Sequence, residues 1–178
     1  MNEIIKSYEF FNIKENLHKE IKESILPLYG EFEYSKPNSD RYGRIKIKLD
    51  IERDLDSLNE IEKKLIEDYE SLEQFYSLKE KYSNDFFVEK IDFDSYKSLN
   101  ISRYHTYKWD VNENILPKEF ETYIKPELIN FIELFSLFQK ENNKIYCFSV
   151  IDGAYKNSER PGHLMATKLA IINLFQKI

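Results

Sequence analysis

The stretch from Lys144 to Ile151 reads Lys-Ile-Tyr-Cys-Phe-Ser-Val-Ile and is almost entirely apolar or small. β-Branched and aromatic residues in a short run between polar neighbours are typical of a strand that is covered on both faces. Asp152-Gly153 follows directly, and because glycine tolerates a positive φ, this pair predicts a turn that ends the strand. The remaining elements of the fold are predicted outward from this strand.

An apolar helix is predicted after the loop 154–162, at the C-terminus of the chain. Its sequence leaves little polar surface around the helical circumference, which is typical of a buried helix. Leu164 and Met165 belong to this apolar set. Ala166 and Ala170 lie one turn apart, and two such small side chains allow the helix backbone to approach a sheet closely.

A second helix is predicted before the strand. Pro117-Lys118-Glu119 is typical of a helix start, because proline is pre-set for the first turn. Pro126 lies inside the helical pattern and predicts a kink or two abutting helices. One continuous apolar stripe at steps of three and four residues supports the helix: Phe120, Ile124, Leu128, Phe131, Phe135 and Phe138.

The first two thirds of the chain contain further predicted strands. Apolar residues at 45, 47, 49 and 51 alternate with charged ones, which predicts a half-solvated strand. A short strand is predicted at 31–34, turn chemistry at 35–40, and two more strands at 86–93 and 103–111. In the last of these, one face is predicted to carry His105, Tyr107, Trp109 and Val111.

Two helical segments are predicted outside this set. The first runs for about four turns from Ile13 and is ended by Pro27 and Gly30. The second lies within 52–83, where apolar residues at near-heptad spacing form a seam that packs on the same chain or on a partner. Four acids near its start are interpreted as surface charges that complement a helix dipole: Asp50, Glu52, Asp54 and Asp56.

The composition indicates a globular chain with an acidic balance. It has 178 residues, 13 Tyr and 13 Phe but only 4 Gly, which argues against disorder. The formal charge of −6 counts against bulk electrostatic binding to nucleic acid. Cys147, the single cysteine, is interpreted as an inert core residue. No signal peptide and no membrane-spanning run is recognised, so a cytoplasmic location is expected.

No constellation of catalytic or metal-binding residues is recognised. The chain has no glycine-rich phosphate loop, so no nucleotide cofactor is expected, and no cluster has metal-ligand spacing. Asp152, Ser158 and His163 are close in sequence, yet a catalytic triad depends on geometry that spacing does not supply. We therefore expect no catalytic residues, no metal and no cofactor.

Three segments together resemble domain IV of elongation factor G. The segment Asn114–Phe120 reads Asn-Ile-Leu-Pro-Lys-Glu-Phe and resembles the Ile-Pro-Lys-Glu-Tyr or -Phe helix start of that family. The strand end Asp152-Gly153-Ala154-Tyr155, followed by Ser158, resembles its Asp-Gly-Ser-Tyr-His strand end. The segment 40–47 resembles the Gln-Tyr-Gly-His-Val-Val-Ile strand that opens the family domain. The segments follow the family's order and cover about half of the chain.

The resemblance implies an α+β, two-layer fold. A mainly antiparallel sheet would carry helices on one face, as in the second domain of ribosomal protein S5, with its unusual left-handed βαβ crossover. The domain would run from 41 to 178 with a helical insertion at about 52–83, and residues 1–40 would pack a helix and a short strand on its core.

The resemblance also implies a functional surface at two loops, 111–118 and 152–163, at one end of the domain. Each loop precedes a helix N-terminus, which favours anions. The residues expected to bind RNA or a partner there are Asn114, Lys118, Tyr155, Lys156, Arg160 and His163.

The resemblance implies a non-enzymatic ribosome- or translation-associated protein that contacts the ribosome or its RNA through these loops. The alternative is a protein-interaction module, such as an immunity or inhibitor protein, that binds a basic protein partner. An enzyme on the same fold is a third hypothesis, which rests on fold analogy alone.

Overall fold

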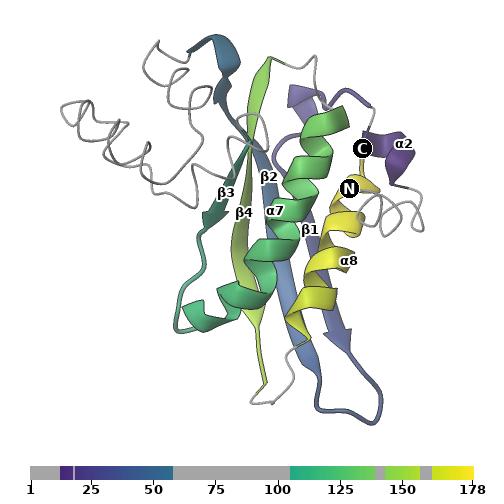
Figure 1. Ribbon diagram of the computed structural model, residues 1–178, viewed down its shortest axis with the longest axis vertical. Helices are drawn as coiled ribbons and strands as arrows, with labels where there is room; N and C mark the ends of the chain where they lie inside the picture. Colours follow the sequence, from purple (N-terminus) through teal and green to yellow (C-terminus); the bar gives the residue numbers. More distant parts are fainter. Residues whose placement is uncertain (1–12, 18, 58–104, 139–142, 157–161) are drawn as a thin grey trace, which may run out of the picture.

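The computed structural model describes residues 13–17, 19–57, 105–138, 143–156 and 162–178. Within these ranges, four strands form one mixed sheet in the order β1-β2-β4-β3. The two long helices, α7 and α8, cover the same face of this sheet (Figure 1). The α+β class predicted from the sequence is confirmed.

The centre of the sheet is an antiparallel pair of long strands, β2 (Tyr42–Asp54) and β4 (Lys144–Ala154). On one side β1 (Leu28–Ser35) pairs antiparallel with β2, and on the other β3 (Thr106–Trp109) pairs parallel with β4. The strand at 45–51 and the strand at 144–151 are therefore neighbours in one sheet, as the resemblance implies.

The alternation in β2 has the predicted consequence. Ile45, Ile47 and Leu49 are completely buried, while the charged residues between them face the other side of the sheet. In β4 the buried positions fall on both faces, since Ser149 is as inaccessible as its neighbours Phe148 and Val150.

The helical layer consists of α7 (Glu121–Phe138), preceded by a 3-10 turn at Lys118–Phe120, and α8 (His163–Phe175). Short helical segments are also present at α2 (Lys14–Leu17), Glu23–Ile25 and Leu55–Ser57. α7 connects β3 to β4, and α8 lies over β1 and β2 (Figure 1).

An aromatic cluster fills the space between the helices and the sheet. The ring of Phe135 lies with its centroid 5.3 Å from that of Phe148, 5.5 Å from that of Tyr146 and 5.6 Å from that of Phe175. Most of these pairs have the edge-to-face geometry that aromatic quadrupoles favour. Phe135 is therefore the residue through which α7, α8 and β4 share one core.

The prediction that Asp152-Gly153 ends the strand in a turn is wrong. β4 continues to Ala154, Gly153 pairs with Ile45, and no glycine among the described residues has a positive φ. A Cβ on Gly153 would lie 2.6 Å from Leu116 Cδ2 and 2.9 Å from the carbonyl oxygen of Arg44. Glycine is present here because of close packing, not because of a turn.

The four-turn helix predicted from Ile13 is also wrong. The α-helix described there has only four residues, Lys14–Leu17, although Ile13, Leu17 and Ile21 are buried as the apolar spacing required. Gly30 does not end a helix: it lies inside β1 and packs against α8. β1 is longer than the predicted strand at 31–34, because residues 28–30, which lay in the segment of the predicted helix, belong to the strand.

The expectation of a kink or two abutting helices at Pro126 is corrected in part. α7 runs through Pro126 as a single element, so two abutting helices are excluded. The change of helical type comes earlier, between the 3-10 turn that ends at Phe120 and the α-helix that begins at Glu121.

Of the four acids interpreted as helix-start charges, three lie in a strand and Asp56 lies in the short 3-10 segment Leu55–Ser57. β2 extends to Asp54, so Asp50, Glu52 and Asp54 are strand residues. Their partners are Lys48, Thr106 and Lys144, respectively. The predicted strand at 86–93 and the predicted helical seam beyond residue 57 lie outside the described residues.

His105 gives the core a dependence on pH. Its ring is buried, 5.0 Å from that of Phe135, and its Nδ1 accepts the Tyr146 N–H at 3.3 Å. Burial lowers the pKa of His105 from 6.5 to about 4. The unfolded chain thus binds a proton below pH 6.5 that the folded chain does not, and folding stability falls as pH decreases from 6.5 towards 4.

We expect this residue to remove about 2 kcal/mol of folding stability between pH 6.5 and pH 5. Urea unfolding of the parent chain and of His105→Phe at both pH values checks it. The variant is expected to be less stable at pH 7 but to show a flatter pH dependence. If the free energy of unfolding changed equally with pH in both proteins, the assignment of this pH dependence to His105 would be contradicted, because most carboxylates titrate below about pH 5.

Candidate functional site

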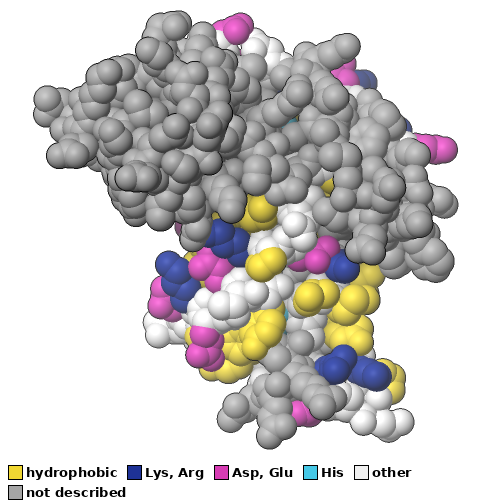
Figure 2. All heavy atoms as spheres, viewed as in Figure 1, with side chains coloured by type: hydrophobic (Ala, Val, Ile, Leu, Met, Phe, Trp, Pro, Cys, Tyr) yellow, Lys and Arg dark blue, Asp and Glu magenta, His cyan; other side chains and the backbone are white. Residues whose placement is uncertain are grey.

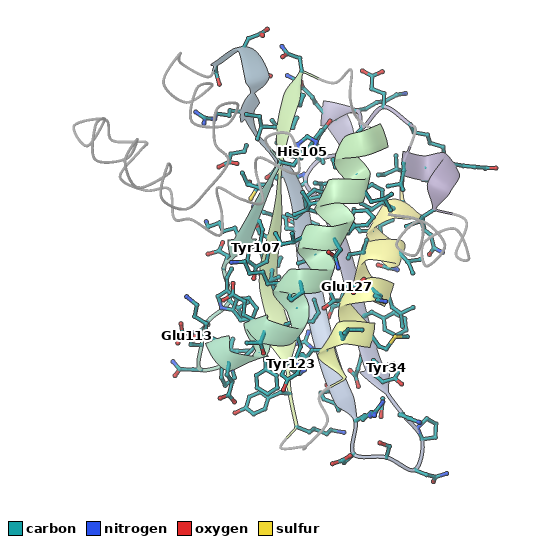
Figure 3. All side chains as sticks on the ribbon, in the orientation of Figure 1. Tyr34, His105, Tyr107, Glu113, Tyr123 and Glu127 are labelled. Atoms are coloured by element: carbon teal, nitrogen blue, oxygen red, sulfur yellow. The ribbon has the colours of Figure 1, made fainter. Side chains whose placement is uncertain are left out.

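The ends of several elements meet at one end of the sheet, which we call the tip: residues 42–44, 110–120, 152–156 and 162–165. It is the lower end in Figure 1, where β2 begins, β3 and β4 end, and α7 and α8 begin. In Figure 3, Glu113 and Tyr123 lie at this end and His105 lies at the other. The described parts of the two loops singled out from the sequence therefore lie at the same end of the domain.

The start of α8 is held against the start of β2 by backbone contacts. Gly162 N–H donates to the carbonyl oxygen of Tyr42 at 2.9 Å. A Cβ on Gly43 would lie 2.7 Å from the backbone nitrogen of His163, so the two backbones touch where glycine leaves room. The position of the α8 N-terminus thus depends on two glycines.

The loop before α7 is fixed to the end of β4. Leu116 is completely buried, with its Cδ2 close to the Cα of Gly153. Asn112 stabilises the loop from within, because its Oδ1 accepts the Asn114 N–H at 2.9 Å and its carbonyl accepts the N–H groups of Ile115 and Leu116. The loop is a compact turn seated on β4.

Phe120 is the centre of an aromatic cluster at the tip. Its ring centroid lies 4.6 Å from that of His163, 4.9 Å from that of Tyr155 and 6.5 Å from that of Tyr123. Phe120 itself is buried, whereas Tyr155 and Tyr123 are exposed. One buried ring therefore supports two exposed ones that come from different elements.

The predicted site residues fall into different environments. Asn114 and Lys118 are exposed in the loop before α7, and Tyr155 is exposed at the end of β4. Lys156 is exposed and holds its Nζ 4.4 Å from the ring centroid of Tyr42, in a cation–π contact. Arg160 lies outside the described residues.

His163, one of the residues expected to bind RNA or a partner, is buried and does not add positive charge to the tip. Its ring is completely buried, its Nε2 lies 2.9 Å from the carbonyl oxygen of Ala154, and burial lowers its pKa below the ordinary value. With Nε2–H donating to that carbonyl, Nδ1 has no partner among the described residues. His163 positions β4, α7 and α8 relative to one another instead of facing a ligand.

The charges at the tip do not form a basic patch. Within the ranges that define the tip, four acids stand against three cations, Arg44, Lys118 and Lys156. Two of the acids are paired with cations of the sheet, since Asp152 lies 3.0 Å from Arg44 Nη1 and Asp110 lies 3.6 Å from Lys108 Nζ. The exposed charges that remain are Glu113 and Glu119 against Lys118 and Lys156.

The exposed apolar side chains at the tip were missed by sequence reasoning. Leu164 and Met165 were expected to be buried, but both are exposed in the first turn of α8, as is Ile115 in the loop before α7. Further along the helix the buried residues face β1 and β2, while Lys168, Leu169 and Asn173 are half-buried. The apolar circumference that predicted burial was the only signal, and it does not report which side of the helix faces away from the sheet: His163 is buried against β2, whereas Leu164 and Met165 are not.

The described residues show no catalytic arrangement. His163 bonds to a backbone carbonyl and Asp152 to Arg44, so they do not pair as a triad would require, and Ser158 lies outside the described ranges. Burial raises the pKa of the Cys147 thiol, which disfavours the thiolate. No group of three metal-ligating side chains occurs in this part of the chain.

No helix among the residues that the structure covers is long and apolar enough to cross a membrane. A scan against protein-family models and a search of curated proteins both give no match to this chain. The proposals that follow therefore rest on the geometry of the tip and on the topology of the sheet.

Proposed function

We propose that this chain is a non-enzymatic, ribosome- or translation-associated binding protein with the fold of domain IV of elongation factor G, and that it binds through the tip. The single observation that carries the proposal is the topology around β4. A parallel β3–α7–β4 unit lies beside an antiparallel β1–β2 hairpin, and all the motif segments converge at one end.

The handedness of the β3–α7–β4 connection supports the proposal. Val150 packs its side chain into the helical face, and its carbonyl accepts the Asp110 N–H at 2.8 Å. When β4 is viewed from the helices and points up, the carbonyl of an L-residue whose side chain faces the viewer points right. β3 therefore lies to the right of β4, and the path from β3 to β4 moves left.

A parallel crossover with its helix towards the viewer and its strands pointing up is right-handed when the second strand lies on the right. Here the second strand lies on the left, so we infer a left-handed crossover. About 98% of such connections are right-handed. A left-handed crossover is the handedness that the resemblance to domain IV implies. Because this handedness is rare, it discriminates between folds more sharply than the α+β class does.

The tip contacts support the same proposal. The three motif segments are each in contact with another: Ile45 pairs with Gly153, Leu116 packs against Gly153, and Phe120 contacts Tyr155. Their order in the chain and their assembly at one end are those expected for a domain that probes a partner with its end.

Tyr155→Ala is expected to weaken co-sedimentation with purified bacterial ribosomes by about tenfold. Tyr155 is an exposed aromatic ring supported from behind by Phe120, and such rings contribute strongly whether they stack on a base or fill a protein pocket. The matched control is Tyr29→Ala, an exposed tyrosine near the opposite end of β1. No co-sedimentation of the unchanged chain at low salt would overturn the proposal.

The second candidate is a protein-interaction module, such as an inhibitor or immunity protein that binds a basic partner away from the ribosome. The balanced charge of the tip, where Lys118 and Lys156 are matched by Glu113 and Glu119, favours a protein over RNA, and the formal charge of −6 of the whole chain favours a basic protein. Purification of the tagged chain with one stoichiometric protein and without ribosomes would distinguish this candidate from the first.

A further inference from the structure

Exposed apolar side chains gather at the tip. Five large hydrophobic residues at the tip and in the adjoining first turn of α7 are 38% to 49% exposed, and Figure 2 shows hydrophobic side chains on the lower half of the helical face. Exposed apolar groups that cluster, unlike those scattered singly, mark interaction sites. We call these five residues the apolar tip surface: Ile115, Tyr123, Tyr155, Leu164 and Met165.

The apolar tip surface draws on three elements that meet around Phe120. Tyr155 and Tyr123 both contact Phe120, which in turn contacts His163, the residue before Leu164. α7 and α8 are joined one turn further on, where Glu127 Oε1 lies 3.7 Å from Lys168 Nζ. Because Tyr123 precedes Glu127 by four residues and Leu164 precedes Lys168 by four, these two side chains lie along the same helix–helix seam.

The rim of the surface does not match a phosphate backbone. RNA binding depends on cations that replace counterions along the phosphates. The exposed charges near the apolar tip surface are balanced, and the whole chain carries a formal charge of −6. An apolar centre rich in Tyr, Leu and Met with charges at its edge is instead typical of a protein–protein interface.

We propose that the apolar tip surface docks on a basic protein surface and not on RNA. The inference rests on the proposed function, since it names the chemistry of the partner at the tip. On a ribosome, the partner that fits the apolar tip surface is a ribosomal protein with an apolar patch surrounded by basic residues. The charge of the chain steers the encounter, and the apolar contact sets the lifetime of the complex.

The experiment compares two immobilised probes, total bacterial ribosomal proteins freed of RNA and deproteinised ribosomal RNA. The unchanged chain is expected to bind the first and not the second. Leu164→Ala is expected to weaken binding about fivefold or more, because an apolar side chain contributes to a protein contact but not to a phosphate contact. The matched control is Ile25→Ala, an exposed apolar residue away from the tip.

A charge-reversal pair gives an independent readout. Glu113→Lys combined with Glu119→Lys is expected to weaken binding to the basic protein surface, whereas it would strengthen binding to RNA. Binding to ribosomal RNA that Leu164→Ala leaves unchanged would overturn this inference and leave the proposed function standing. Binding to neither probe, together with no binding to intact ribosomes, would overturn both.

Discussion

Phe135→Ala is expected to lower the free energy of unfolding by about 3–5 kcal/mol. The Phe135 ring is completely buried and contacts aromatic rings from α7, α8 and β4, as well as the ring of His105. Truncation removes apolar area and leaves a cavity that rigid neighbouring rings do not fill. Since a domain of this size is stabilised by about 5–15 kcal/mol, this one change removes a large share of the total.

Urea titration followed by circular dichroism measures this effect. Phe135→Leu is the matched control and is expected to cost clearly less than alanine, because it keeps most of the buried volume. Tyr123→Ala, an aromatic truncation at an exposed position of the same helix, is expected to be close to neutral. A loss for Phe135→Ala no larger than that for Tyr123→Ala would show that the aromatic core is not shared as described.

Gly30→Ala is expected to destabilise the fold by about 3 kcal/mol or more. A Cβ on Gly30 would lie 2.1 Å from the carbonyl oxygen of Ala170 and 2.6 Å from Leu174 Cβ. The first of these atoms belongs to the helix backbone and has no rotamer by which to move aside. β1 and α8 would therefore have to move apart and lose the close packing that Gly30 and Ala170 allow.

The same titration measures this effect, with Glu33→Ala as the control at an exposed position of the same strand. That control changes no buried contact and is expected to stay within about 0.5 kcal/mol of the parent. A Gly30→Ala protein as stable as Glu33→Ala would contradict the close approach of α8 to β1.

The sheet was predictable where local pattern and burial coincide. Ile45, Ile47 and Leu49 alternate with charged residues, and only a strand with one buried face explains that spacing. Ala166 and Ala170 indicated a close helix–sheet contact, which the structure has at Gly30. In these cases the pattern of residue types has a single structural explanation, so the sequence is sufficient to predict the contact.

The errors arise where a residue type has more than one physical use. Gly153 is a glycine because Leu116 occupies the space of its Cβ, and sequence alone does not separate that reason from a turn. His163 is buried because Phe120 and the end of β4 cover it. Leu164 and Met165 are exposed because they lie on the side of α8 that faces away from β2, whereas His163 before them is buried. Each outcome depends on a neighbour that is distant in the chain.

The order of the strands has a consequence for how this chain tolerates change. The β2–β4 pairs at the centre of the sheet join residues between 90 (Asp54 with Lys144) and 110 (Arg44 with Ala154) positions apart. The connection from β2 to β3 starts and finishes at the end of the sheet away from the tip (Figure 1). Loop-closure entropy grows with the logarithm of length, so doubling that connection costs only about 0.6 kcal/mol. A fluorescent reporter spliced between β2 and β3 would therefore slow folding more than it would shift the equilibrium.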